Sequence, residues 1–493
     1  RVGTSMTDRA QYETALHELL HGHIAVLGCA VAGFGAAAGL LGSGEFTGRV
    51  TIMDAADNDA VRARADIIAA LGGQVLLGYD GPLPEGATLL VVSPGVPLEH
   101  PMIVQARAAS VEVIGEIELA WRLRTVGASA AAPWLVVTGT NGKTTTTLML
   151  QSILQAAGLR SAAVGNIGNS IVDTIMDPVG YDVFAVEVSA QQLPFVSSMS
   201  PTASVVLNLA QDHLDYFANF DEYRSAKAVA YQRTQVAALW NVSDPATEQM
   251  LIDADVVEGC RAIGITLGVP SISMMGLVED MLVDRAFLDE RHSHATPMAH
   301  LADIPVPGPH NVFNALAAAG LARAINVAPA AIARGLRDFT PAGHRVAEVL
   351  TQDGVTWVDD SKATNTHAVD ASLRAYQRVV WVAGGLAKGQ AFEDLVGAHR
   401  ERIKAAVLIG ADRGVIAEAL AAQAPEVDVT IVDDDQAEAA MAAAVAAAAG
   451  YALDGDVVLL APGCSSWDLF AGGYAERGDS FAAAVRRHVT GSR

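Results

Sequence analysis

The residues Trp134–Thr147 place the strongest constraint on this chain, because they read as a strand, a glycine turn and a helix in immediate succession. The turn has the order Gly139-Thr-Asn-Gly142-Lys143-Thr144. Unpaired N–H groups at the start of a helix attract anions, and glycine lets the backbone approach a phosphate closely. The stretch therefore predicts a nucleotide phosphate loop, in which Lys143 reaches the terminal phosphates and the Thr144 hydroxyl binds magnesium. The match is partial because Val137 stands where the strict pattern has glycine, and the alternative is an ordinary glycine turn with a surface lysine.

Length and composition bound the kind of protein. At 493 residues the chain exceeds one hydrophobic core, so we expect two to four domains. A net charge of −23 argues against a nucleic-acid partner, because the chain has too few cations to neutralise a phosphate backbone. The three cysteines are far apart and odd in number, which fits neither a disulfide framework nor a zinc site. We find no signal peptide and no apolar run long enough to span a bilayer, and therefore expect a cytoplasmic protein without membrane insertion.

The first part of the chain reads as a Rossmann-like α/β domain. The run Ile24–Gly35 is a strand that leads into a glycine turn and a helix, and Val50–Asp54 is a second strand that ends in a carboxylate. Such a carboxylate often holds a ribose hydroxyl, so we expect a nucleotide or nucleotide sugar here. Ala30 replaces the middle glycine of the fingerprint, and the alternative is that these glycines serve packing alone. We close this domain near Trp121.

A second motif near the start, His17-Glu-Leu-Leu-His21, spells the zinc-protease signature on a short predicted helix over residues 8–20. Only His23 follows closely, and neither a third ligand nor a surrounding protease domain is apparent. We expect a solvated helix, with a zinc hydrolase as the distant alternative.

A linker rich in glycine, alanine and serine over residues 126–133 leads into the domain that contains the phosphate loop. Two further predicted strands end in polar groups, Glu187 after one and Asp212-His213-Leu-Asp215 after the other. Ligands collect at the carboxyl ends of parallel strands, so we expect Glu187 and His213 to lie near the phosphates. Lys227 lies within a predicted helix over residues 221–231, and the short strands of residues 260–307 indicate a small side sheet.

A third α/β unit begins at Pro341–Arg345, and its strands alternate with helices from Val355 to Leu460. Polar loops follow its strands at residues 360–365, 384–388 and 462–468. The predicted fold class is therefore α/β in three domains. Rossmann-like domains at 1–121 and 342–493 flank a central phosphate-loop ATPase domain at 122–341, which has a parallel sheet and the side sheet.

A series of short motifs in fixed order resembles the Mur ligases of peptidoglycan synthesis. The motifs are Gly139-Thr-Asn-Gly-Lys-Thr144, Gly165-Asn-Ile-Gly168, Asp212-His-Leu-Asp215, Tyr223-Arg-Ser-Ala-Lys227, His310-Asn-Val-Phe-Asn-Ala315, Gly343-His-Arg345 and Asp360-Ser-Lys-Ala-Thr-Asn365. The resemblance runs from about Ile24 to His488, and the last motif is similar to that of the members that add D-glutamate. It implies a first domain that holds a UDP-sugar, a central ATPase, and a third domain that brings the amino acid.

The activity implied by the resemblance is the ATP-driven joining of D-glutamate to UDP-N-acetylmuramoyl-L-alanine. The alanine carboxylate attacks the γ-phosphate to give an acyl phosphate, and the amine of D-glutamate then displaces phosphate. The implied cofactors are ATP, two magnesium ions and a carbamylated Lys227. A carbamate turns the ammonium into an anion, which requires a neutral amine to react with carbon dioxide. We expect the enzyme to act as a monomer.

The resemblance also implies roles for single residues. The catalytic residues would be Lys143, His213 and Lys227, and the metal ligands Thr144, Glu187, His213 and Lys227. ATP would contact Gly139, Thr140, Asn141, Gly142, Lys143, Thr144, Thr145, Asn311, Asn314, Arg345, Asp360 and Lys362. The uridine diphosphate would contact Gly28, Val31, Ala32 and Asp54, and the muramoyl-alanine end Asn166 and His213. The carboxylates of D-glutamate would contact Thr364, Lys388, Ser466 and the backbone near Tyr474.

The sequence departs from the family pattern at two places. Ala190-Gln191 precedes Gln192 where Ser-Phe is usual, and Glu348 lies one residue further from His344-Arg345 than expected. The alternatives within the superfamily are another Mur ligase and a folylpolyglutamate synthetase-like ligase. Outside the enzymes, the alternative is a nucleotide-gated protein that binds UDP-muramoyl precursors.

Overall fold

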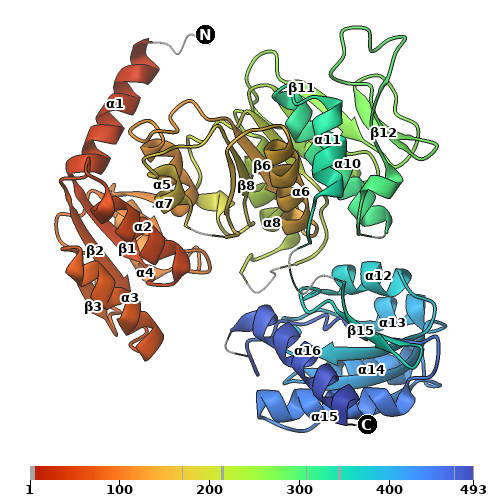
Figure 1. Cartoon of the computed structure of the whole chain (residues 1–493). Coiled ribbons are helices and arrows are strands. Elements are labelled where there is room, and N and C mark those ends of the chain that lie inside the picture. Colours follow the sequence, from red (N-terminus) through yellow and green to blue (C-terminus); the bar gives the residue numbers. More distant parts are fainter. Residues whose placement is uncertain are drawn as a thin grey trace. The chain divides into compact units, whose positions relative to one another are not determined.

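The chain forms an α/β protein with three β-sheets (Figure 1). The computed structural model describes residues 6–168, 170–212, 216–306, 308–341, 343, 346–470 and 472–491. Contacts divide the chain near Phe339 into two compact units, and short segments after Leu209 and Pro305 belong to the second unit. The first unit contains two of the sheets and the second unit contains the third.

The first sheet has the predicted Rossmann-like form, with five parallel strands in the order β3-β2-β1-β4-β5. The strands are β1 (His23–Leu27), β2 (Arg49–Asp54), β3 (Gln74–Leu77), β4 (Leu89–Val92) and β5 (Glu112–Gly115). The helices of this part are α1 (Met6–His21), α2 (Val31–Gly42), α3 (Asp59–Ala70), α4 (Pro101–Ala108) and α5 (Glu116–Leu123). β1 is buried along its whole length, as its apolar sequence requires in a sheet covered on both faces. The strand order reverses between β1 and β4, where such sheets bind ligands.

The second sheet has nine strands in the order β14-β13-β12-β11-β10-β9-β6-β8-β7. The strands are β6 (Trp134–Thr138), β7 (Ser161–Gly165), β8 (Val183–Glu187), β9 (Ala203–Val206), β10 (Ala237–Asn241), β11 (Arg261–Ile265), β12 (Met274–Val278), β13 (Met281–Asp284) and β14 (Thr296–His300). Neighbours from β7 to β12 are parallel, and the last two pairings are antiparallel. The short strands expected between residues 260 and 307 therefore extend the edge of this sheet, because β11 pairs directly with β10.

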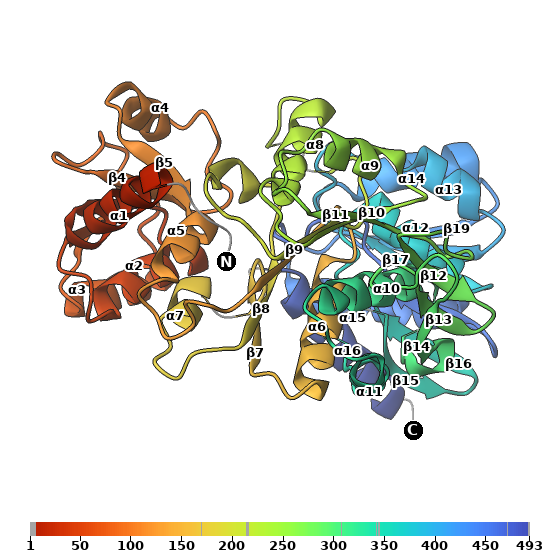
Figure 2. The same cartoon turned by 90° about the horizontal axis from the view of Figure 1, so that it is seen from above.

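Helices and short 3₁₀ turns follow the strands of the second sheet. They are α6 (Lys143–Ala156), α7 (Ile171–Ile175), η1 (Leu193–Phe195), α8 (Phe220–Ala228), η2 (Val229–Tyr231), α9 (Pro245–Ile252), η3 (Leu301–Asp303), α10 (Pro309–Ala324) and α11 (Pro329–Arg337). α6 and α11 pack side by side in both views (Figure 1, Figure 2). A Cβ atom on Gly335 would lie 2.3 Å from the Ile153 Cα, so this close approach requires glycine.

The third sheet, in the second unit, has six strands in the order β15-β16-β20-β17-β18-β19. Its strands are β15 (Ala347–Gln352), β16 (Val355–Asp359), β17 (Val379–Gly384), β18 (Ile403–Ile409), β19 (Asp428–Ile431) and β20 (Val457–Leu460). Its helices are α12 (Thr366–Arg374), α13 (Glu393–His399), α14 (Arg413–Gln423), α15 (Ala437–Tyr451) and α16 (Gly473–Gly491). Only the pairing of β15 with β16 is antiparallel, and its register shifts between Glu348 and Leu350.

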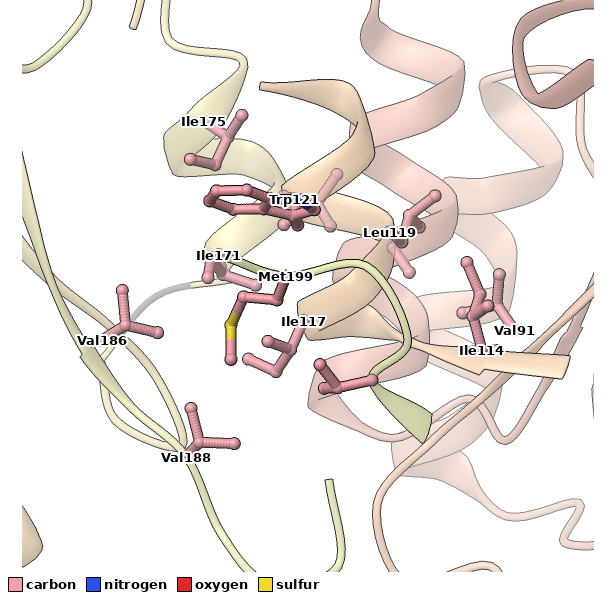
Figure 3. Packing of buried hydrophobic residues seen from close by; sticks show 14 of the residues in the cluster. Val91, Ile114, Ile117, Leu119, Trp121, Ile171, Ile175, Val186, Val188 and Met199 are labelled. Carbon is pink, nitrogen blue, oxygen red and sulfur yellow. The ribbon is translucent and has the colours of Figure 1, made fainter. Parts of the chain in front are cut away.

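Helix α5 joins the cores of the first two sheets. Every residue of this helix is buried, and one hydrophobic cluster contains side chains from both sheets. Figure 3 shows Ile117 on the side of Val186 and Val188, whereas Leu119 lies toward Val91 and Ile114. A helix that is buried all round packs against neighbours on every side and has no solvated face.

Two carboxylates in the first turn of α5 are buried in different surroundings. Glu118 accepts hydrogen bonds from the backbone N–H groups of Ser197 and Ser198 and from the Arg122 guanidinium at 2.9 Å. Burial opposes ionisation of Glu118, but the Ser198 hydroxyl and Arg122 hold its pKa below the ordinary value. Burial raises the pKa of Glu116 to about 7, against a hydrogen bond from Gln192. The same helix therefore carries one carboxylate held ionised and one held close to neutrality.

We predict that Glu116→Gln stabilises the protein as the pH rises. The pKa of Glu116 moves from 4.5 to about 7 on folding, so the folded state binds this proton more tightly than the unfolded state. The free energy of unfolding that the parent protein gains from this proton is therefore fully present below pH 4.5, and it is lost as the pH rises through 7. Between these two pH values, the free energy of unfolding of the variant should rise by about 3 kcal/mol relative to that of the parent. Urea unfolding followed by tryptophan fluorescence measures this difference. As the pH rises, the free energy of unfolding of Glu118→Gln should instead fall relative to that of the parent. Parallel pH profiles of the free energy of unfolding for Glu116→Gln and the parent would contradict the prediction.

Candidate functional site

The phosphate loop lies between β6 and α6, as predicted. Gly139 and Gly142 adopt φ angles of +155° and +83°, and Gly142 is the residue before the first turn of α6. A Cβ atom on Gly142 would lie 2.5 Å from Asn314 Oδ1, so only glycine fits beneath this side chain. The structure therefore brings Asn314 of α10 against the loop. Thr144 and Thr145 follow in the first turn of α6.

Polar side chains from two other segments fix the conformation of the loop. The Asn141 N–H donates to Asn208 Oδ1 at 2.9 Å, and Asn208 Nδ2 donates to the Asn141 carbonyl at 3.1 Å. The hydroxyls of Thr140 and Tyr223 share a hydrogen bond of 2.8 Å. The sequence predicts no role for Asn208 or Tyr223. Their partners lie more than 60 residues away, so no local pattern marks them.

Two lysines converge on the carbonyl of Gly139. Lys143 Nζ donates to the carbonyls of Gly139 and Thr140, both at 2.9 Å. Lys227 Nζ donates to the Gly139 carbonyl at 2.8 Å, and its side chain is 1% exposed. Its ammonium also lies 4.8 Å from the centre of the Tyr223 ring. The lysine that reads as a solvated helix residue without the resemblance is thus buried at the phosphate loop.

Glu187 lies at the end of β8, directly beside the strand that carries the loop. Its Oε1 accepts a hydrogen bond of 2.9 Å from Asn166 Nδ2, and its side chain is 1% exposed. Its Oε2 is buried and has no hydrogen-bond partner among the residues that the structure describes. A buried carboxylate oxygen without a donor is costly, and a divalent cation with hard oxygen ligands would satisfy it. The residues present therefore fit a magnesium ion.

Two predicted site residues, His213 and Arg345, lie outside the described residues. Asn311 lies on α10, as does Asn314, and both side chains are buried. Asp212 accepts a hydrogen bond of 3.2 Å from Asn365 Nδ2 within the second unit.

The predicted uridine diphosphate residues surround the turn between β1 and α2. Gly28 adopts a φ angle of +97°. Asp54 accepts a hydrogen bond of 2.6 Å from the N–H of Cys29, which ties this turn to the end of β2, and one of 2.8 Å from the N–H of Ala56 in its own turn. Val31 is exposed, Ala32 is half-buried, and Val31 borders a cavity of about 420 Å³ between α2 and α7.

The predicted D-glutamate residues lie on loops at the carboxyl ends of strands in the third sheet. Lys362, which is predicted to contact ATP, lies on one of these loops with its Nζ 3.9 Å from the centre of the Tyr474 ring, and the Ser361 hydroxyl donates to the Tyr474 carbonyl at 2.7 Å. Lys388 takes a left-handed conformation, with φ at +52°. The loop just before it is bridged to the other loop, since the backbones of Leu386 and Ser465 exchange two hydrogen bonds of 2.9 Å.

The remaining predicted residues of these loops are well ordered by hydrogen bonds. Ser466 is buried, and its carbonyl accepts from the N–H of Phe470 at 2.9 Å. The Thr364 N–H donates to the Lys362 carbonyl at 2.9 Å. Asp360 is buried and accepts from the Val346 N–H and the Ser372 hydroxyl.

Arg477, which the sequence reasoning missed, ties the three loops together. It donates to the Ser361 hydroxyl at 2.9 Å, to the Cys464 carbonyl at 3.1 Å and to the Gly384 carbonyl at 3.4 Å. Its side chain is 1% exposed, and burial lowers its pKa to about 10. An arginine inside α16 looks like a surface residue from sequence, because only the distant loops explain its burial.

The zinc-protease motif lies on α1. The rings of His17 and His21 are 4.4 Å apart, and His21 Nδ1 hydrogen-bonds to the Thr47 hydroxyl at 2.5 Å. Within the described ranges, no group of three or more His, Cys, Asp or Glu side chains is arranged to hold a metal. A search of the same ranges for a helix long and apolar enough to cross a membrane also finds none.

Two family models match the chain. The Mur ligase middle domain matches residues 137–322, and the Mur ligase glutamate ligase domain matches residues 344–464. Together they cover more than half of the chain.

Similar proteins agree with these matches. The chain is 51% identical to "UDP-N-acetylmuramoylalanine--D-glutamate ligase" of Streptomyces coelicolor, over 94% of this chain and 98% of that protein. It is 46% identical to the protein of the same name from Thermobifida fusca, over 95% and 99% of the two chains. The crystal structure of MurF from Acinetobacter baumannii has the same fold, with a TM-score of 0.59 at 17% identity over 91% and 94% of the two chains. The chain belongs to the Mur ligase family.

Proposed function

We propose that this protein is an ATP-dependent ligase that adds D-glutamate to UDP-N-acetylmuramoyl-L-alanine, with release of ADP and phosphate. The observation that carries the proposal is the gathering of Lys143, Lys227 and Glu187 around one phosphate loop. Relatives at 46–51% identity over nearly their whole length have the name of this activity, which supports the choice of substrates. The enzyme would act in the cytoplasm as a monomer.

The first step transfers the γ-phosphoryl group of ATP to the alanine carboxylate. A carboxylate oxygen is a poor leaving group, and phosphorylation makes it a good one. Lys143 and the N–H groups of the loop would hold the charge of the transferring group, which is mainly positioning and electrostatics. Asn314 over Gly142 and Asn311 on the same helix would contact the nucleotide.

Magnesium and a modified lysine complete this part of the proposal. Thr144 and Glu187 would hold one magnesium ion, and carbamylated Lys227 with His213 would hold a second. When bound, magnesium neutralises phosphate charge that would repel the attacking carboxylate. Asn166 would fix the ligand geometry by its hydrogen bond to Glu187 Oε1, as partners of metal ligands commonly do.

The second step forms the amide bond. The amine of D-glutamate attacks the acyl carbon, the bond to the phosphate oxygen breaks, and phosphate leaves. Thr364, Lys388, Ser466 and the backbone near Tyr474 would hold the two carboxylates of D-glutamate. The proposed domains are residues 1–121, 122–341 and 342–493, each of which contains one of the three sheets. In this order they would bind the UDP-sugar, ATP and D-glutamate.

The amino-acid requirement tests the proposal directly. With ATP, magnesium and UDP-N-acetylmuramoyl-L-alanine, phosphate release should depend on D-glutamate and should not respond to L-glutamate or meso-diaminopimelate. The same assay with UDP-N-acetylmuramate and L-alanine tests another branch of the family. Phosphate release with L-alanine or meso-diaminopimelate but not with D-glutamate contradicts the proposal. ATP binding without phosphate release contradicts it as well.

We predict that Lys143→Ala lowers kcat by about two to three orders of magnitude, because one charge-stabilising donor is lost. Lys404→Met is the matched control. Lys404 pairs with Asp456, which keeps an ion pair of 2.7 Å with Arg378. The control should retain the parent rate. Equal losses in both variants would indicate a general effect of removing a lysine rather than a role at the phosphates.

Lys227 should carry a carbamate in the active enzyme. Protein incubated with ¹³C-bicarbonate should give a carbamate carbon signal in the NMR spectrum that is missing from Lys227→Arg. Arginine keeps the positive charge but does not form the carbamate, so the variant should also be inactive. A spectrum without this signal in fully active protein contradicts the carbamate.

A further inference from the structure

The turn that follows Glu187 is closed by a side chain of the turn itself. Gln192 Oε1 accepts a hydrogen bond of 2.8 Å from the Ser189 N–H. The Gln192 N–H in turn donates to the Ser189 hydroxyl at 3.3 Å. Residues 189–192 are therefore held as one unit by the amide of Gln192, directly after the strand that carries Glu187.

The amide of Gln192 is itself held by Glu116 of α5. Gln192 Nε2 donates to Glu116 Oε1 at 2.8 Å, and the two side chains are 3% and 5% exposed. The carbonyl oxygen of the amide can then only face Ser189, because rotating the amide would lose both hydrogen bonds in a buried place. Glu116 thus fixes the direction in which Gln192 holds the turn.

The turn is short enough to transmit this constraint to the nucleotide site. Between Glu187 and Ser189 lies only Val188, whose N–H donates to the Val137 carbonyl at 2.9 Å. The Val188 carbonyl accepts from the Thr138 hydroxyl at 2.7 Å. Val137 and Thr138 are the last residues of β6 before the phosphate loop. A shift of the turn would therefore move Glu187 and the end of β6 together.

We propose that Glu116 is a positioning residue for the Glu187 carboxylate, acting through Gln192 and Ser189, and thereby sets the affinity for a divalent cation. The proposal rests on the function proposed above, in which Glu187 is a metal ligand. Glu116 itself lies on the helix that joins the first sheet to the second, and it contacts neither nucleotide nor metal in this scheme. Glu118, in the same helical turn, holds the different segment Ser197–Met199.

The test measures metal binding rather than turnover. Mn²⁺ is titrated into the full-length protein with the non-hydrolysable analogue AMP-PNP, and free Mn²⁺ is followed by electron paramagnetic resonance. Glu116→Ala should raise the dissociation constant of Mn²⁺ about tenfold, as the loss of a partner behind a metal ligand does. Glu116→Gln should keep the parent value, because its amide oxygen still accepts from Gln192.

Two controls separate positioning from stability. Glu118→Gln should lower the unfolding midpoint and leave the Mn²⁺ affinity unchanged. Gln192→Ala should weaken Mn²⁺ binding to the same extent as Glu116→Ala, and the double variant should be no weaker than either single one, since both break one chain of contacts.

Three results with the variants would overturn the proposal. They are parent-like Mn²⁺ affinity in folded Glu116→Ala, an equal loss in Glu118→Gln, and additive losses in the double variant. Absence of Mn²⁺ binding to the parent protein with AMP-PNP also overturns it. Parent protein that binds Mn²⁺ but releases no phosphate with D-glutamate contradicts the proposed function alone, and the comparison of variants still decides this inference.

Discussion

The turn between β6 and α6 depends on the placement of two ammonium groups against one backbone carbonyl. Lys143 and Lys227 both donate to Gly139, although they come from different helices and lie 84 positions apart in the sequence. Like charges held this close repel one another, which costs free energy, and an anion or a chemical change nearby lowers that cost. A triphosphate beside Lys143 and a carbamate on Lys227 would each lower this cost. The closeness of the two lysines therefore favours the binding of an anion before any reaction takes place.

The elements that present these groups are predictable because their signals are local. A buried strand, a glycine turn and a lysine at the start of a helix all fall within 14 residues, and the strand that ends at Glu187 is equally compact. The α/β class and the Rossmann-like first sheet follow from the same alternation of strands and helices. The strands between residues 260 and 307 show the limit of such signals, since their pattern gives strands but not the sheet that they join.

What the sequence does not give are the partners that hold these elements in place. Asn208 and Tyr223 orient the loop, Asn314 covers it, and Gln192 reaches Glu116 across 76 positions. None of these pairs has a spacing that a periodicity would detect, because the fold alone brings them together. Asp54 is a further example. Its position at the end of β2 predicts a ligand, while its hydrogen bond from the N–H of Cys29 also gives it a part in holding the turn after β1.

Arg477 recognises its three loops almost entirely through main-chain carbonyls and one serine hydroxyl. Carbonyl acceptors are the same for every amino acid, so the side chains beyond them can be exchanged without loss of the anchor. The arrangement of the three loops therefore does not depend on which side chains they carry. Side chains at the loop tips can then change in evolution while one guanidinium keeps the loops in place.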